Sequence, residues 1–197
     1  KAEIGKNIGE IGKVTLSNTI DHQSTWETVE FQNWYRFPVV VPFIMTRNGD
    51  QSVDVRVKDV KSTSCEIFME EPDGGDHASE EVGYIVMEMG TYELEEGIKI
   101  EAGRVITDSI HYSGQNYGGE EVIFHQEFES KPVLLHSLNS YCNGNFMSTV
   151  AHGVTKNRFM IQQESGESGN SGTREYPGIG WIAIESDVNR YLDYPSD

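Results

Sequence analysis

Four sequence blocks occur twice along the chain in the same order, and this repetition constrains the fold more than any other feature of the sequence. In the first copy they are residues 12–14, 29–41, 60–70 and 83–88, and in the second copy they are residues 103–105, 122–135, 154–164 and 180–185. Corresponding positions lie 91 to 97 residues apart, as from Gly12 to Gly103 and from Gly83 to Gly180. Each copy is long enough to bury a core of its own, so the repeat predicts a duplicated domain rather than a solenoid.

Within each copy, apolar and polar residues alternate with the period of a β-strand. The runs of the first copy cover residues 13–16, 28–31, 39–45, 53–57, 65–70 and 82–89, and Gly, Asn, Asp or Pro bound them. Hardly any stretch of helical length has apolar residues at three and four spacing. The pattern predicts an all-β chain made of two tandem antiparallel β-sandwich modules.

The boundary between the modules is expected near Ala102. We assign residues 1–101 to the first module and residues 102–197 to the second. Residues 90–101 look like an extra hairpin of the first module, which leads into the second and holds the two in fixed contact. The positions expected to be buried are Phe31, Val40, Val60, Ile67, Tyr84 and Val86 in the first module, and Phe124, Leu134, Val154, Ile161, Trp181 and Ala183 in the second.

The charge of the chain excludes several kinds of partner. Asp and Glu number 32 against 15 Lys and Arg, for a formal net charge of -17. Such a field repels nucleic acid and anionic membrane surfaces, and it suits calcium, a cationic partner or solubility at high ionic strength. The longest apolar run, residues 38–45, is too short to insert into a membrane as a helix. Because the chain starts at Lys1 rather than Met, we interpret it as a processed chain or a piece of a larger protein.

The order of the repeated blocks resembles the H-type lectin domain, which runs from an F-x-x-x-F-x-x-x-P-V-like strand pair to a late W-x-A strand. The matching residues of the second copy are Phe124, Phe128, Pro132, Val133, Val154, Phe159, Ile161, Trp181 and Ala183. Those of the first copy are Phe31, Tyr35, Pro38, Val39, Val60, Ile67, Tyr84 and Val86. The resemblance implies a six-stranded antiparallel sandwich that binds N-acetylgalactosamine-like sugars, commonly between the protomers of a trimer. A fused pair departs from the usual single copy and leaves open a homo-oligomer or a part in a larger secreted assembly.

Aromatic, amide and arginine side chains in turn-rich loops are the candidates for a sugar site. Sugar rings stack on aromatic faces, and planar polar groups replace the hydrogen bonds of displaced water. The candidates are Tyr141, Asn143, Asn145, Arg174 and Tyr176 in the second copy, and Trp34, Arg47 and Asn48 in the first. The alternatives are a cluster of Asn-Gly turns around Asn143, an exposed ion pair of Arg174 with Glu175, and core packing of Trp34.

An acidic loop of the first copy is a candidate calcium site. Asp73, Asp76 and Glu80 follow one another among glycines that permit tight turns, although their spacing is not that of an EF-hand. The alternative is an ordinary solvated loop, and no cofactor is required for the expected function. The two cysteines, Cys65 and Cys142, indicate neither a zinc site nor a disulfide framework, and a bridge between them is left open.

Three functions fit the sequence. We favour a non-catalytic, extracellular or cell-surface protein that binds a glycan or polysaccharide. The alternative is a structural or adhesive surface module whose exposed aromatic residues contact other proteins. The third is an enzyme that degrades polysaccharides with two carboxylates, for which Glu70 with Glu88 and Glu164 with Glu185 are the candidate pairs. No nucleophile elbow and no phosphate-binding loop are found, so we expect no catalysis.

Overall fold

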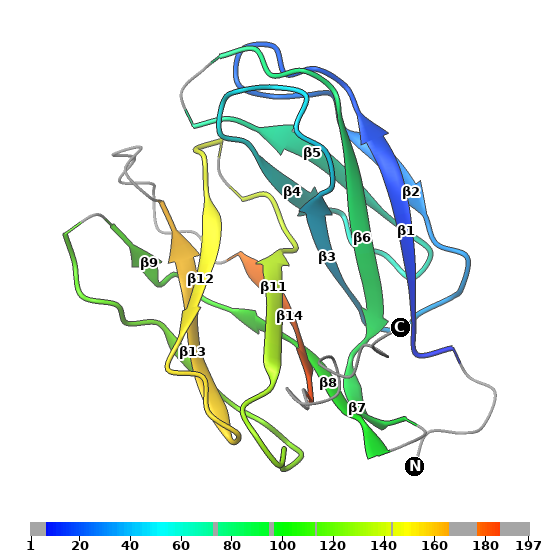
Figure 1. Ribbon diagram of the computed structural model, residues 1–197, viewed down its shortest axis with the longest axis vertical. Coiled ribbons are helices and arrows are strands. Elements are labelled where there is room, and N and C mark those ends of the chain that lie inside the picture. The colour runs from blue at the N-terminus through cyan, green and yellow to red at the C-terminus, as the bar shows by residue number, and fades with distance from the viewer. Residues whose placement is uncertain are drawn as a thin grey trace, which may run out of the picture.

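The computed structural model describes residues 7–72, 75–94, 97–112, 114–142, 144–165 and 177–185 of the chain. These residues contain fourteen β-strands and no helix (Figure 1). The strands are β1 (Gly9–Leu16), β2 (Glu27–Glu30), β3 (Pro38–Ile44), β4 (Asp54–Lys58), β5 (Ser64–Glu70), β6 (Glu80–Glu88), β7 (Gly90–Glu93), β8 (Lys99–Ile106), β9 (Ile110–His111), β10 (Glu120–Ile123), β11 (Val133–Leu138), β12 (Ser148–His152), β13 (Arg158–Glu164) and β14 (Gly178–Ile184). The prediction of an all-β chain is confirmed. Among the described residues, no helix is long and apolar enough to cross a bilayer.

The first half of the molecule consists of β1 to β6 in two antiparallel three-stranded sheets. One sheet has the order β1-β6-β3 and the other the order β2-β5-β4. Alternate side chains of both sheets meet in a core that includes Leu16, Tyr35, Val40, Ile67 and Val86, all fully buried. The half is therefore sandwich-like, because two sheets enclose one apolar layer.

The second half repeats this arrangement and adds two strands. Its sheets have the orders β11-β14-β8-β7 and β10-β13-β12, with β9 paired to β13 in parallel. The core between them includes Phe124, Phe128, Phe159, Ile161 and Trp181. Without β7 and β9, the strand order of each sheet is the same as in the first half.

The register of the strands is also the same in both halves. Val29 pairs with Cys65 between β2 and β5, and Val122 pairs with Phe159 between β10 and β13. Each of these positions is aligned by the sequence repeat. Gly12 of β1 lies opposite Tyr84 of β6, as Gly103 of β8 lies opposite Trp181 of β14.

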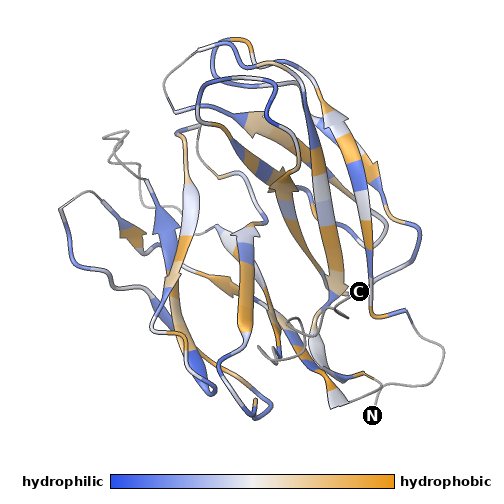
Figure 2. Cartoon of the chain, in the orientation of Figure 1, coloured by the Kyte–Doolittle hydropathy of each residue, from blue (hydrophilic) through white to orange (hydrophobic). Residues whose placement is uncertain are grey.

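The two halves stack through their inner sheets. The sheet β1-β6-β3 faces the sheet β11-β14-β8-β7 across a third apolar cluster, here called the interface core, which consists of Val39, Val41, Met87, Ile100, Ala102 and Ile182. Strands β3 and β14 therefore bury both faces, since successive side chains point to opposite sides of a sheet. Figure 1 shows the halves side by side, and Figure 2 shows hydrophobic residues along much of β3, β6 and β11.

The hairpin between the halves belongs to the second half, whereas the sequence analysis assigns it to the first. Strand β7 pairs with residues 99–102 of β8, as the expected hairpin does, and residues 100–106 of the same strand pair with β14 on the other side. The hairpin thus extends a sheet of the second half rather than the first. Its apolar residues Tyr92 and Ile98 pack against the interface core, to which Ile100 belongs.

Most positions expected in the two cores are buried. Val60, Tyr84, Leu134 and Val154 are only partly buried, but each packs against the core of its half. Cys65 is buried and Cys142 is exposed, and both are free thiols. Burial raises the pKa of the Cys65 thiol to about 12.

Candidate functional site

Tyr141, a predicted sugar-binding residue, lies in the loop after β11 and packs against the first half. Its ring meets the rings of Trp26 and Phe68 edge-on, with centroids 5.3 and 5.5 Å apart. The guanidinium of Arg56 lies 4.9 Å from the ring centre, and the hydroxyl accepts a hydrogen bond from Gln23 Nε2 at 2.8 Å. The ring covers the outer face of the sheet β2-β5-β4, where it shields the fully buried Phe68. A role for Tyr141 in sugar binding stays a prediction.

Two asparagines of the same loop also join the halves. The side chain of Asn139 accepts a hydrogen bond from Val40 N at 2.9 Å and donates one to Val40 O at 2.6 Å. Asn139 is buried, and β3 is an edge strand. The Asn139 amide therefore makes the two hydrogen bonds to Val40 that the backbone of a further strand would otherwise make. The carbonyl of Asn145 accepts a hydrogen bond from Arg56 Nη1 at 3.1 Å. This junction is therefore held by directional bonds as well as by apolar contact.

A buried ion pair lies beneath the Tyr141 loop. Arg56 Nη1 is 2.5 Å from Glu70 Oε2, and each side chain is only 2% exposed. Burial raises the pKa of the Glu70 carboxyl, and Arg56 opposes that effect. The counterpart of Glu70 in the second half, Glu164, lies 2.6 Å from His111 Nδ1. Both carboxylates of the predicted catalytic positions at these strand ends thus have a basic partner.

A small polar hollow of about 170 Å³ adjoins this ion pair at the junction. Residues of β4, β11 and β12 line it, among them Asp54, Arg56, His136 and Thr149. Burial raises the pKa of Asp54, which Arg56 opposes, and burial lowers the pKa of His136. His136 Nδ1 lies 2.7 Å from Thr149 Oγ1. The hollow is polar but small, and it belongs to the packing between the halves.

The other carboxylates of the predicted catalytic pairs hold loop backbones. Glu88 accepts hydrogen bonds from Arg36 N at 2.5 Å and Phe37 N at 2.8 Å. Its counterpart Glu185 accepts one from Glu129 N at 2.8 Å, at the corresponding place in the second half. This repetition is what a shared structural role produces, because the same loop must be fixed in each half.

The remaining predicted sugar-binding residues are spread over separate loops. Trp34 is 60% exposed in the loop between β2 and β3. Arg47 and Asn48 are exposed in the loop between β3 and β4, where Asn48 Nδ2 donates to Ser79 O at 2.8 Å. Asn143, Arg174 and Tyr176 lie outside the described residues, as does Asp73 of the predicted calcium site.

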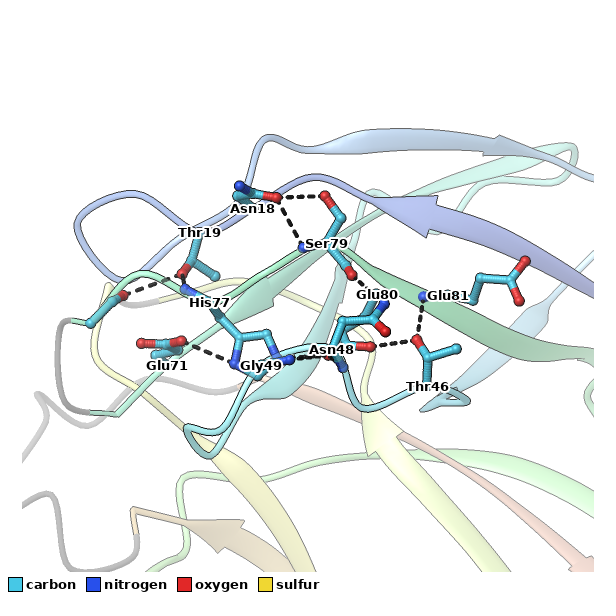
Figure 3. Close-up of polar contacts among 11 residues, drawn as sticks. Asn18, Thr19, Thr46, Asn48, Gly49, Glu71, His77, Ser79, Glu80 and Glu81 are labelled. Carbon is cyan, nitrogen blue, oxygen red and sulfur yellow. Dashed lines mark hydrogen bonds and ion pairs between the residues drawn. The ribbon is translucent and has the colours of Figure 1, made fainter.

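Glu80 of the predicted calcium site is buried and fully engaged by hydrogen-bond donors (Figure 3). Its carboxylate accepts hydrogen bonds from Thr46 Oγ1, from Asn48 N at 2.6 Å and from Gly49 N at 3.1 Å. His77 Nε2 lies 2.9 Å from the same carboxylate. Burial alone would raise the pKa of Glu80, but the four hydrogen bonds outweigh burial and lower the pKa to about 2.

His77 lies between two buried carboxylates. Its Nδ1 is 3.2 Å from Glu71 Oε1, while its Nε2 faces Glu80. All three side chains are about 1% exposed, so the group ties the acidic loop to the body of the first half. Asp76 is exposed instead. Among the residues that the structure describes, no three His, Cys, Asp or Glu side chains are arranged to hold a metal ion. The position of His77 within the acidic loop is a sequence signal for this group, but it does not reveal the pairing of His77 with Glu71.

The fold and these contacts define an all-β, sandwich-like protein whose two halves form one packed unit. The chain is similar to a part of halomucin from Haloquadratum walsbyi, with 30% identity over 185 residues. The similar region covers 86% of this chain and 2% of halomucin, so the chain spans a small fraction of the length of that relative. No family model matches the chain, and no solved structure matches it.

Proposed function

We propose that the chain is a non-catalytic module of an extracellular or cell-surface protein, and that it serves as a rigid unit that contacts other macromolecules. The interface core carries this proposal, since Val39, Val41 and Ile182 are almost fully buried between the halves. Interfaces that are large and apolar suppress relative motion of domains. The Asn139 bonds to Val40 add direction to that contact.

Similarity to a short stretch of halomucin supports the rest of the proposal. A chain that matches 2% of a relative fits one unit among many in a long protein. The relative also supports an extracellular or cell-surface location. The sequence repeat, the shared strand order and the shared register support an origin of the two halves by duplication of one sandwich.

The test of rigidity is whether the two halves unfold together. We expect a single transition in urea when hydrogen exchange is followed separately in β5 and β13, and two transitions in the variant Val41→Lys. Val41 is 5% exposed in the interface core, so a buried lysine there separates the halves. Ile11→Lys is the matched control, because Ile11 lies in the same row of the same sheet but is 82% exposed. Separate unfolding of the halves in the unaltered chain would contradict the rigid role, and conversion of a polysaccharide would contradict the non-catalytic one.

Binding of a glycan is a second candidate function, favoured by two exposed aromatic residues in one loop. Trp34 and Phe37 are 60% and 55% exposed between β2 and β3. The six strands in two three-stranded sheets of the first half, and the same strand order in the second half without β7 and β9, also fit the H-type lectin resemblance. A glycan panel titrated against Trp34→Ala tests it, with Phe43→Ala as the control, since Phe43 is a similarly exposed aromatic residue elsewhere. The same panel with and without calcium tests the proposed ion at Asp73, Asp76 and Glu80.

A further inference from the structure

Within the described part of the chain, strand β8 has an open edge along its second part. Strand β7 pairs with β8 only from Lys99 to Ala102. Beyond that point, no described strand pairs with residues 103–106 on the side that β7 occupies. An open edge offers unpaired backbone N–H and C=O groups, which another extended segment can use as a template.

Two hollows lie on either side of this open edge. The larger, of about 610 Å³, lies over Val105 and Trp181 and reaches the exposed Ile123 of β10. The smaller, of about 450 Å³, lies over Ile106 and reaches Phe37 of the first half. Met89 and Arg104 line both. We call the two hollows and the edge between them the edge groove.

The smaller hollow carries unpaired positive charge. Arg36, Lys61 and Arg104 line it, and all three are exposed. None of them has an ion pair or a side-chain hydrogen bond with a described residue, although Arg36 lies 5.0 Å from the centre of the Phe37 ring. Unpaired cations are unexpected in a chain with 32 acidic and 15 basic residues, where carboxylates are abundant. By contrast, Lys13 and Lys58 each form an ion pair with a glutamate on the neighbouring strand.

The larger hollow is mainly apolar, although Glu101, Arg104 and His125 also line it. Val105, Val122, Ile123 and Trp181 give it an apolar lining. Glu121, at its rim, is already paired with Arg158. A strand that added to β8 would direct alternate side chains to the two faces of the sheet, and so into the two hollows in turn.

We propose that the edge groove binds an extended peptide segment in which apolar and acidic residues alternate, as an additional strand on β8. The apolar side chains fill the hollow over Trp181, and the acidic ones meet Arg36, Lys61 and Arg104. This inference rests on the proposed role as a contact-making module and names the contact surface.

The test uses an acetylated hexapeptide of alternating valine and glutamate, titrated into the whole chain and followed by NMR. We expect shifts of the backbone amides of Gly103 and Val105 that saturate with peptide. Arg104→Ala and Lys61→Ala each weaken binding about five-fold or more, because each removes one charge contact. Lys131→Ala is the matched control, since Lys131 is an exposed lysine that lies outside the edge groove, and it leaves binding unchanged.

Two altered peptides separate strand addition from simple attraction. A peptide of alternating valine and lysine is expected not to bind. N-methylation of the hexapeptide at its valines or at its glutamates removes one row of N–H donors, and at least one of the two versions loses binding. Equal binding of the lysine peptide, of both N-methylated peptides or of polygalacturonate would overturn the proposal, as would an equal loss in Lys131→Ala.

The outcome is also separable from the rigid role of the module. If the unaltered chain unfolds in one transition and the hexapeptide does not bind, the edge groove proposal alone fails. If the peptide binds and the halves unfold separately, the rigid role fails and the groove stands.

Discussion

The indole ring of Trp181 lies against the backbone of Gly103 on the neighbouring strand. The two residues are directly opposite each other, and a Cβ added at Gly103 would stand 2.4 Å from Trp181 Cζ2. Tyr84 covers Gly12 in the same way in the first half, where an added Cβ would stand 2.2 Å from its hydroxyl oxygen. A large ring fits at these places in the central strand only because the residue opposite has no side chain.

Replacement of these glycines should therefore destabilise the fold. We expect Gly103→Ala to lower the free energy of unfolding by about 1–3 kcal/mol, because the buried indole must move within a packed core. Gly12→Ala should cost less, since Tyr84 is only partly buried. Urea unfolding measures both, with Gly118→Ala as control, because its nearest side-chain atom is 3.8 Å from the added Cβ. No loss of stability in Gly103→Ala would contradict the ring packing.

The sequence repeat allowed much of this arrangement to be predicted. It aligned Gly12 with Gly103 and Tyr84 with Trp181, and the alternation of apolar residues located the strands to within a few residues. Alternation cannot say which sheet an added strand joins. The pairing of β7 with β8 is that of the predicted hairpin, but the pattern does not show that β8 continues into a sheet of the second half, since this placement depends on the interface core beneath both strands.

The candidate site was harder to predict, because an aromatic residue in a polar loop has the same pattern whether it binds a ligand or a neighbouring sheet. Tyr141 packs on Trp26 and Phe68, which lie more than 70 residues earlier in the sequence. Only the fold brings those rings together. Likewise, the spacing of Glu80 and His77 could not reveal that backbone N–H groups surround the carboxylate.

A pair of glycines at corresponding positions provides an internal comparison for the junction. A Cβ at Gly180 would stand 2.4 Å from Asn139 Oδ1, whose bonds to Val40 join the halves. A Cβ at Gly83 would stand 2.5 Å from the Phe43 ring, which is half exposed. We expect Gly180→Ala to cost about 2 kcal/mol or more in unfolding free energy, because a buried amide loses its partners, and Gly83→Ala to cost less. Equal effects in calorimetric melting would show that Asn139 does not hold the junction.

Substitution of Tyr141 should affect stability first. Tyr141→Ala exposes Phe68 and removes two edge-on aromatic contacts, so we expect a loss of about 2–4 kcal/mol in unfolding free energy. Tyr141→Phe removes only the hydrogen bond from Gln23 and should cost about 1 kcal/mol. Trp34→Ala, at an exposed ring, should stay within about 0.5 kcal/mol of the unaltered chain. Chemical denaturation measures all three. No change in unfolding free energy in Tyr141→Ala would show that this ring does not stabilise the contact between the halves.

Low pH should lower the stability of the first half, because it protonates the Glu80 carboxylate. Its pKa is lowered to about 2 in the folded chain from a usual value near 4.5, so the unfolded chain takes up the proton first as the pH falls. The stabilisation is complete above pH 4.5 and is lost towards pH 2, for a total of roughly 3 kcal/mol. Urea unfolding of the unaltered chain and Glu80→Gln across this range should show that the variant lacks this part of the pH dependence. Glu81→Gln, on the adjacent and only partly buried residue, should retain it, and a pH dependence shared by all three proteins would contradict the assignment.

Salt should stabilise the whole chain, because its carboxylates repel one another. With a net charge of -17, the folded chain concentrates negative charge that the unfolded chain spreads out. Screening shortens the range of that repulsion from about 10 Å at 0.1 M salt to about 3 Å at 1 M. We expect the melting temperature to rise by several degrees between these concentrations, in sodium chloride and in choline chloride alike, since screening does not depend on the identity of the cation.

A variant with glutamine at the exposed positions Glu30, Glu93 and Glu129, none of which forms an ion pair, should melt higher at low salt and respond less to added salt. A rise confined to sodium chloride would point to bound cations instead, and an equal slope in the variant would show that these surface charges do not limit stability.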